Sequence, residues 1–216
     1  MTDQPKIESA LTLALSSDGL QDLAAEYAEL GLDALLESGI AREIPILSTI
    51  VGFARLGVTV RDRLFLKKVL DFLRPMSLMP KKTRAEMIAK LESDPEYGRK
   101  VGEHLIELID RNEAHRKPRM LARVLLAYGA GEIDAVMLHR LFHAVEHLPA
   151  FAIPEVRRLA ESFPPDRGAD ATTNTIAQLY LGMAGLAVPQ SSFDALTYDP
   201  TPVAAAFIRL ELDRQE

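Results

Sequence analysis

The sequence predicts an all-α protein, a multi-helix bundle with a small winged-helix-like hairpin near the C-terminus. Apolar residues recur at helical spacing along most of the 216 residues, and few segments alternate as a strand would. Proline, glycine and N-capping residues divide this pattern into separate segments. With 48 % apolar and 26 % charged residues, the composition is that of a globular protein that buries a core.

Start and stop signals set the expected elements in order. Asp94-Pro95-Glu96 is a strong helix start, since an acidic N-cap precedes a proline at the first helical position. Pro75 and Pro80 are expected to break the helix before them. Residues 186–199 are expected to pair as a hairpin around 190–192. The expected helices cover residues 20–36, 44–73, 83–91, 95–114, 117–128, 135–148, 154–163, 171–185 and 202–213.

These elements suggest two parts, a helical bundle over residues 1–150 and a C-terminal module over residues 151–216. The stretch PPDRGADATT, residues 164–173, is the best linker candidate. The chain has no cysteine, which excludes disulfides, thiolate zinc sites and thiol nucleophiles and is compatible with the cytoplasm. We expect no signal peptide and no membrane-spanning helix.

Charge is unevenly distributed within the net −6. Residues 1–43 hold nine acidic and two basic residues, whereas residues 55–84 hold nine basic and two acidic ones. The overall sign argues against nucleic acid as a partner. The basic island suits an acidic protein, an anionic membrane surface or acidic neighbours in the same chain.

The segment Ile44–Arg74 combines an uncharged first half with a basic second half. In its first half, Ile46, Ile50 and Phe53 share a face that suits a core helix. A membrane-active segment that swings out of the core is the alternative. In the second half, Arg63, Lys67 and Arg74 share a face, and Arg61 and Lys68 flank it, so these five residues form the predicted partner-binding surface.

A row of histidines offers a different chemistry. His143, Glu146 and His147 match the H-x-x-E-H pattern of inverted zinc metalloproteases, and His139 lies one turn upstream. Histidines four residues apart on a helix can grip one metal ion. The row falls on the polar side of its helix, where solvated histidines are the simpler interpretation and a metal site is the alternative. Hydrolysis is the remotest option.

No catalytic group emerges elsewhere. Glu103, Glu107 and Asp110 share a helical face, which we interpret as solvated rather than as paired acid–base carboxylates. Neither a G-x-S-x-G elbow nor a phosphate-binding loop is present. The sequence therefore predicts a protein without enzymatic activity and without a cofactor.

Two resemblances accompany this interpretation. Residues 121–148, with the turn AYGAGEID, resemble the tellurite-resistance TerB-like helical proteins, which implies a helical bundle with acidic metal-linked sites. Only Glu132 and Asp134 match such acids, and Asp134 is also explained as an N-cap. Residues 154–213 resemble a winged-helix half-module in their order helix, helix, hairpin, helix, which implies a protein-docking role.

The sequence thus favours a prokaryotic accessory protein of the cytoplasm that binds an acidic macromolecule through a basic helix. Its expected partner is a protein, with a second copy of the chain as a further candidate. A membrane-associating effector that uses residues 44–74 is the first alternative. A metal-binding protein that uses His139, His143 and His147 is the second.

Overall fold

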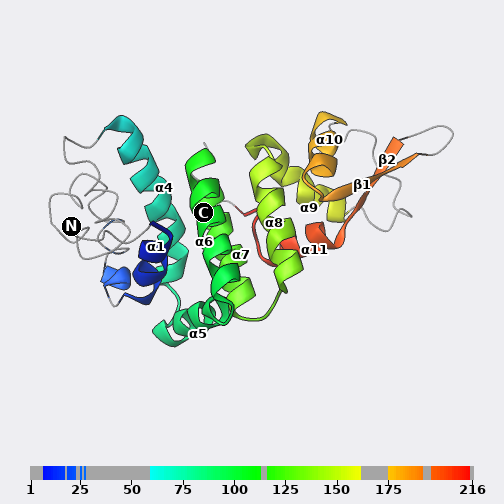
Figure 1. Ribbon diagram of the computed structural model, residues 1–216. Coiled ribbons are helices and arrows are strands. Elements are labelled where there is room, and N and C mark those ends of the chain that lie inside the picture. The colour runs from blue at the N-terminus through cyan, green and yellow to red at the C-terminus, as the bar shows by residue number, and fades with distance from the viewer. Residues whose placement is uncertain are drawn as a thin grey trace. The chain divides into compact units, whose positions relative to one another are not determined.

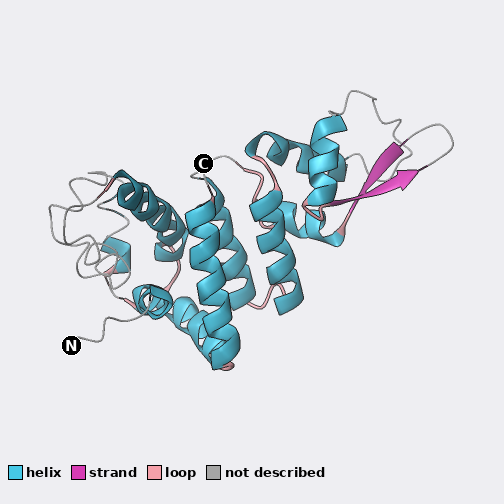
Figure 2. Cartoon of the chain, turned by 45° about the horizontal axis from the view of Figure 1, so that its top comes forward, coloured by secondary structure: helices cyan, strands magenta, loops and turns pink. Residues whose placement is uncertain are grey.

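The structure is a computed structural model that describes residues 7–17, 19–22, 25, 27, 59–112, 116–161, 175–191 and 196–214. These residues are mostly helical, and one antiparallel hairpin lies near the C-terminus (Figures 1 and 2). The predicted all-α fold with a small hairpin is confirmed. Two compact units are present, residues 1–132 and 133–216. This grouping assigns α8 (Ala135–His147) to the second unit, whereas the predicted division lies at residue 150.

In the first unit, α4 packs against α6 and α7, and α5 packs against α1, α6 and α7 (Figure 1). The helices are α1 (Ile7–Ser16), α4 (Val60–Ser77), α5 (Lys81–Glu92), α6 (Pro95–Arg111) and α7 (Arg116–Gly129). Apolar side chains at helical spacing supply the core, among them Leu66, Val69, Phe72, Leu73, Val101, Leu105, Leu108, Leu121, Val124 and Leu125.

Arg84 of α5 is the largest fully buried side chain of the described residues, with an exposure of 1 %. Its guanidinium donates to the carbonyl oxygens of Met76 and Met79 at 3.4 and 3.1 Å, and to that of Ser17 at 3.3 Å. These carbonyls lie at the ends of α4 and α1, and that of Met76 also accepts from the backbone N–H of Met79 at 3.2 Å. A cation is favourable at a helix C-terminus, so one arginine stabilises two helix ends.

A second buried charge, Asp71, lies in the middle of α4 with an exposure of 1 %. Its Oδ1 accepts from Arg119 of α7 at 2.7 Å (Nη2) and 3.2 Å (Nε). Burial, followed by the charge of Asp71, raises the pKa of Tyr27. The pair fixes the register of α4 against α7, because a buried carboxylate needs its partner in place.

The second unit begins with α8 and ends with the hairpin and the last helix. Its other elements are the 3-10 helix η2 (Ala150–Ala152), α9 (Ile153–Glu161), α10 (Thr175–Met183), β1 (Ala187–Ser191), β2 (Leu196–Pro200) and α11 (Pro202–Arg209). The strands pair from Ala187 with Pro200 to Ser191 with Leu196, and the hairpin extends beyond the helices (Figure 2). Arg157 of α9 closes the unit by binding Asp213 through two hydrogen bonds, of 2.5 and 3.0 Å.

Local start signals are confirmed where side chains cap a helix. Asp94 and Asp134 each accept a hydrogen bond from the backbone N–H three residues ahead, as the sequence predicts, and Thr201 does the same at the start of α11, where the sequence predicts only the proline that follows it. Three other expectations are wrong. Pro75 does not end α4, because a proline in the last turn removes only one hydrogen bond. Helix α5 begins at Lys81 rather than at Thr83, and α1 was not expected at all.

The expected helix over residues 20–36 is described only at its start, and the linker 164–173 lies outside the described residues, as do Ile46, Ile50 and Phe53. Within the described part of the chain, no helix is long and apolar enough to cross a membrane.

Candidate interaction surface on helix α4

Helix α4 starts with a reciprocal cap. The backbone N–H of Asp62 donates to Thr59 Oγ1 at 3.2 Å, and the backbone N–H of Thr59 donates to Asp62 Oδ2 at 2.9 Å. The Thr59 hydroxyl also donates to Asp62 Oδ2 at 2.6 Å. These hydrogen bonds lower the pKa of the Asp62 carboxyl. The cap fixes where α4 begins and therefore which face each basic residue occupies.

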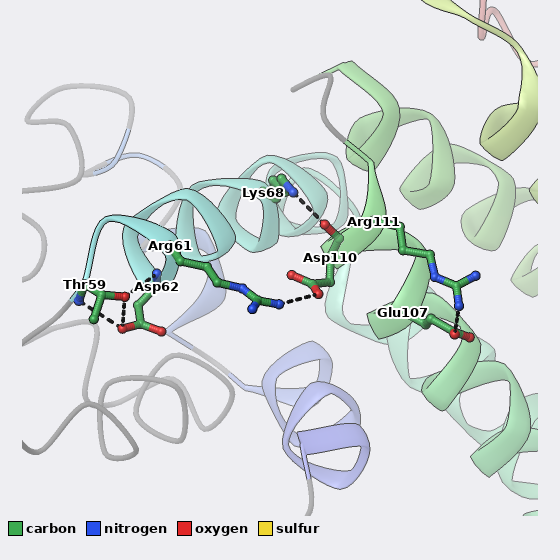
Figure 3. Close-up of polar contacts among 7 residues, drawn as sticks. All are labelled: Thr59, Arg61, Asp62, Lys68, Glu107, Asp110 and Arg111. Carbon is green, nitrogen blue, oxygen red and sulfur yellow. Dashed lines mark hydrogen bonds and ion pairs between the residues drawn. The ribbon is translucent and has the colours of Figure 1, made fainter.

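Two of the predicted binding residues, Arg61 and Lys68, are directed toward the end of α6 (Figure 3). Arg61 Nη2 lies 3.3 Å from Asp110 Oδ2, and Lys68 Nζ donates to the Asp110 carbonyl oxygen at 2.7 Å. That carbonyl is in the last turn of α6, where an ammonium replaces the missing backbone donor. Arg61 remains 85 % exposed, so its ion pair contributes little.

Between α4 and α6 lies an open hollow of about 350 Å³. It is lined by Arg61, Asp62, Phe65, Glu103, Ile106, Glu107 and Asp110. The acidic residues here belong to ion pairs on the surface. Glu107 pairs with Arg111 at 2.5 Å (Figure 3), and Glu103 pairs with Arg99. The arrangement agrees with a solvated acidic face better than with paired catalytic carboxylates, because each carboxylate has its own cation.

The remaining basic residues lie on another side of α4. We call the set Val60, Arg63, Leu64, Lys67 and Arg74 the α4 face; at 3.6 residues per turn they fall on one side of the helix. Val60 and Leu64 are 75 % and 50 % exposed, and Arg63 and Arg74 are exposed as well. Neither Lys67 nor Arg74 forms an ion pair with a carboxylate within the part of the chain that the structure describes.

Asp71 lies on the same side of α4 as these residues, between Lys67 and Arg74. Because it is buried by its pairing with Arg119, it interrupts the surface rather than belonging to it. The α4 face is therefore an apolar and basic patch near the start of the helix, with Arg74 less than one turn beyond the interruption.

The histidine row lies on α8 in the second unit. His143 Nε2 is 3.3 Å from the Met183 carbonyl oxygen, and His147 Nδ1 is 3.0 Å from the His143 carbonyl oxygen. A carbonyl only accepts, so these two ring nitrogens donate and do not bind metal in this arrangement, whereas the second nitrogen of each ring is not engaged by these two contacts. The two rings stack with centroids 4.1 Å apart. His139 is exposed one turn away.

The described residues contain no group of three or more histidine, aspartate or glutamate side chains that is placed to hold a metal ion. Of the two acids in the TerB-like stretch, Asp134 caps α8 by accepting from the Met137 N–H at 2.7 Å, and Glu132 is exposed. Each of these residues thus has a structural role or a surface position, and we assign no metal site to them.

Comparison with known protein families, with characterised proteins and with solved structures finds no match.

The sequence identified the five basic residues of α4 and, from helical spacing, separated Arg61 and Lys68 from the other three. It did not show that Arg61 and Lys68 contact α6, whereas Lys67 and Arg74 do not. No sequence signal gives that contact, since it depends on where the end of α6 lies. The exposure of Val60 and Leu64 was also missed, although their spacing of four residues is visible in the sequence.

Proposed function

We propose that this protein is a non-enzymatic binding protein that docks an acidic protein partner on the α4 face. One observation carries the proposal: apolar and basic side chains alternate along one side of α4, all of them exposed except the half-buried Lys67, and Lys67 and Arg74 lack carboxylate partners within the described residues. Such a surface fits an amphipathic helix that presents leucine-like and acidic side chains at the same spacing.

Charge complementarity supports an acidic partner. A lysine and an arginine that have no carboxylate partner within the described residues gain long-range attraction to an acidic partner during encounter. Val60 and Leu64 supply the apolar contact that charge alone does not provide. The net charge of −6 disfavours nucleic acid, since repulsion would oppose the phosphate backbone.

An anionic membrane surface is the second candidate, and the same exposure of Val60 and Leu64 favours it. An amphipathic helix with basic residues beside apolar ones can lie in the interface of acidic lipids. Docking to a protein remains the primary proposal because the apolar part of the α4 face is small. Peripheral binding to a bilayer generally needs a broad apolar side of the helix.

We place this function in the cytoplasm of a prokaryote as an accessory role, on the cysteine-free composition and the general sequence pattern. The order of elements from α9 to α11, helix, helix, hairpin, helix, supports the winged-helix resemblance. A winged-helix module would add a second docking surface.

The test is fluorescence anisotropy with a labelled helical peptide that carries leucine and glutamate at spacings of three and four residues. The full-length chain should bind this peptide, and affinity should fall as salt rises. The double variant Lys67→Glu/Arg74→Glu should weaken binding roughly tenfold or more, because two attractions become repulsions. A peptide with lysine in place of glutamate should not bind.

The matched control is Lys82→Glu/Lys100→Glu, which makes the same change in net charge at exposed positions of α5 and α6. It should leave peptide affinity within about twofold of wild type, since screening limits distant charges. Equal losses in both double variants would show a net-charge effect and contradict the α4 face.

Vesicle flotation separates the membrane candidate. The protein could bind phosphatidylglycerol vesicles, not bind phosphatidylcholine vesicles and show no affinity for the acidic peptide. This result would contradict the protein partner and favour an anionic membrane as the ligand of the α4 face. Leu64→Ser should weaken whichever interaction is real, because both need the apolar contact.

A further inference from the structure

The second unit contains a cavity of about 490 Å³, and the proposed docking on the α4 face makes no use of it. Its walls come from three segments: one side of α8, the end of α10 and the start of α11. The lining residues are His139, Arg140, His143, Ala184, Gly185, Thr201, Pro202 and Val203. A volume of this size is within the usual range of small-molecule pockets.

The far wall is rigid for identifiable reasons. Gly185 has a φ of +71°, which ends α10 in the left-handed region, and the Leu186 N–H donates to the Leu181 carbonyl at 2.9 Å. The Thr201 hydroxyl then donates to the Gly185 carbonyl at 2.8 Å, and this ties the start of α11 to the end of α10. A preformed wall lowers the cost of ordering a ligand.

The near wall provides the positive charge. Arg140 lines the cavity, and no ion pair or hydrogen bond of its guanidinium is found within the described residues. His143 is held by its hydrogen bond to the Met183 carbonyl, and His139 lies beside it. The lining contains no acidic residue. A guanidinium without a carboxylate next to apolar walls is suited to an anion that brings its own apolar part.

An apolar approach leads to the same place. Ile176, Leu179 and Met183 lie three and four residues apart on α10 and are all exposed. Met183 directly precedes the cavity residues Ala184 and Gly185. The exposed apolar residues of α10 thus end next in sequence to the cavity lining, and apolar surface beside a cation favours an amphipathic ligand over a purely polar one.

We propose that this cavity binds a small amphipathic carboxylate, of which a medium-chain fatty acid is the simplest example. The carboxylate pairs with Arg140, and the hydrocarbon contacts Ala184, Pro202 and Val203. The site lies in the second unit and shares no residue with the α4 face, so it stands or falls independently of the protein-docking function.

The test is isothermal titration of the full-length protein with decanoate below its micelle concentration. Decan-1-ol and decyltrimethylammonium serve as probes with the same chain and a different head group. Decanoate should bind with one site per chain, the alcohol more weakly and the cation not detectably. Equal affinities for all three would overturn the proposal, because the head group would then not be recognised.

Two variants locate the site. Arg140→Met keeps the apolar stem and removes the charge, and it should weaken decanoate roughly tenfold or more without changing the affinity for decan-1-ol. His139→Trp places a large side chain at the cavity, and it should weaken both ligands. The control Arg214→Met removes an exposed arginine that does not line the cavity, and it should change neither affinity.

Circular dichroism should show unchanged helix content in all three variants, since the substituted side chains are exposed. Wild-type decanoate affinity in a folded Arg140→Met protein would overturn the assignment of the carboxylate to Arg140. Absence of any decanoate heat, confirmed by unchanged amide NMR shifts for residues 184–203, would overturn the site itself.

Discussion

Helices α4 and α8 each carry a row of cationic or titratable side chains at helical spacing. The two rows differ in which of their side chains contact another element. On α4, Arg61 and Lys68 bind the end of α6, Asp71 is buried against Arg119, and Lys67 has no carboxylate partner within the described residues. On α8, His143 binds the end of α10, His147 binds its own helix, and Arg140 lines a cavity.

The difference shows what spacing can and cannot tell. Spacing places residues on one side of a helix, but the neighbouring element decides which of them become structural. In both rows, a side chain that reaches the carbonyl end of another helix is used for packing, whereas Lys67 and Arg140, which precede Lys68 and His143 in the chain, have no such contact within the described residues. Four measurements would sharpen or break this comparison.

The largest effect is expected at Asp71. Asp71→Asn removes the charge that Arg119 requires in a buried site, and it should lower the free energy of unfolding by about 3 kcal/mol. Urea denaturation measures this change through the midpoint at constant slope. The double variant Asp71→Leu/Arg119→Leu should recover much of the loss, because an apolar pair removes both buried charges. If the double variant loses more than either single one, burial of the pair is not the reason.

A smaller effect is expected at His143. His143→Phe keeps the ring and loses the hydrogen bond to the Met183 carbonyl, so unfolding should become easier by about 1 kcal/mol. Arg140→Met, three residues earlier on α8, should change the same free energy by less than about 0.5 kcal/mol. Thermal unfolding followed by circular dichroism compares the two. Equal losses would erase the distinction between a structural and an available residue on α8.

The adjacent residues Lys67 and Lys68 allow the same comparison on α4, between a lysine that contacts another helix and one that does not. Lys68→Met should lower stability by roughly 0.5 to 1 kcal/mol, since the Asp110 carbonyl loses its ammonium donor. Lys67→Met should be close to neutral, because no ion pair is lost within the described residues. Chemical denaturation of both variants in one buffer decides the matter. A larger loss for Lys67 would mean that the α4 face is part of the folded core.

The smallest effect concerns the capping box and depends on pH. The pKa of Asp62 is lowered from 3.8 in the folded protein, so its carboxylate stabilises α4 above that value, and the contribution is lost as pH falls through the folded pKa. Asp62→Asn should therefore be less stable than wild type at pH 7, and the difference should vanish in acid. A difference that does not decrease at all as the pH falls below 3.8 would show that ionisation of Asp62 is not involved.

Sequence reasoning succeeded where structure is local. Asp94, Asp134 and Thr201 start helices because a short polar side chain caps the backbone two or three residues away. It failed at α1, where no capping residue precedes Ile7 at the expected spacing and tertiary packing supplies the stability. It also failed at Pro75, which removes one backbone hydrogen bond inside α4 but does not end the helix, because burial of Phe72, Leu73 and Met76 holds the last turns in place.

The candidate sites could be predicted only in part for the same reason. The basic residues of α4 and the histidines of α8 are visible in the sequence, since each row lies on one helix. The partners that divide each row, Asp110 and Met183, lie about 40 residues away, as the separations of 42 and 40 positions show. The cavity combines α8, α10 and α11, and no local pattern brings these segments together.

Arg84 has a consequence for synthesis of the chain. It closes the carbonyl end of α1 at Ser17 from 67 positions further along, so the N-terminal helix emerges from the ribosome long before its cation does. Until residue 84 arrives, α1 has neither that cap nor the α5 and α6 surfaces against which it packs. Helix α1 is therefore synthesised before α5 and α6 but is secured only after they emerge, and the apolar side that it packs against them stays uncovered during that interval.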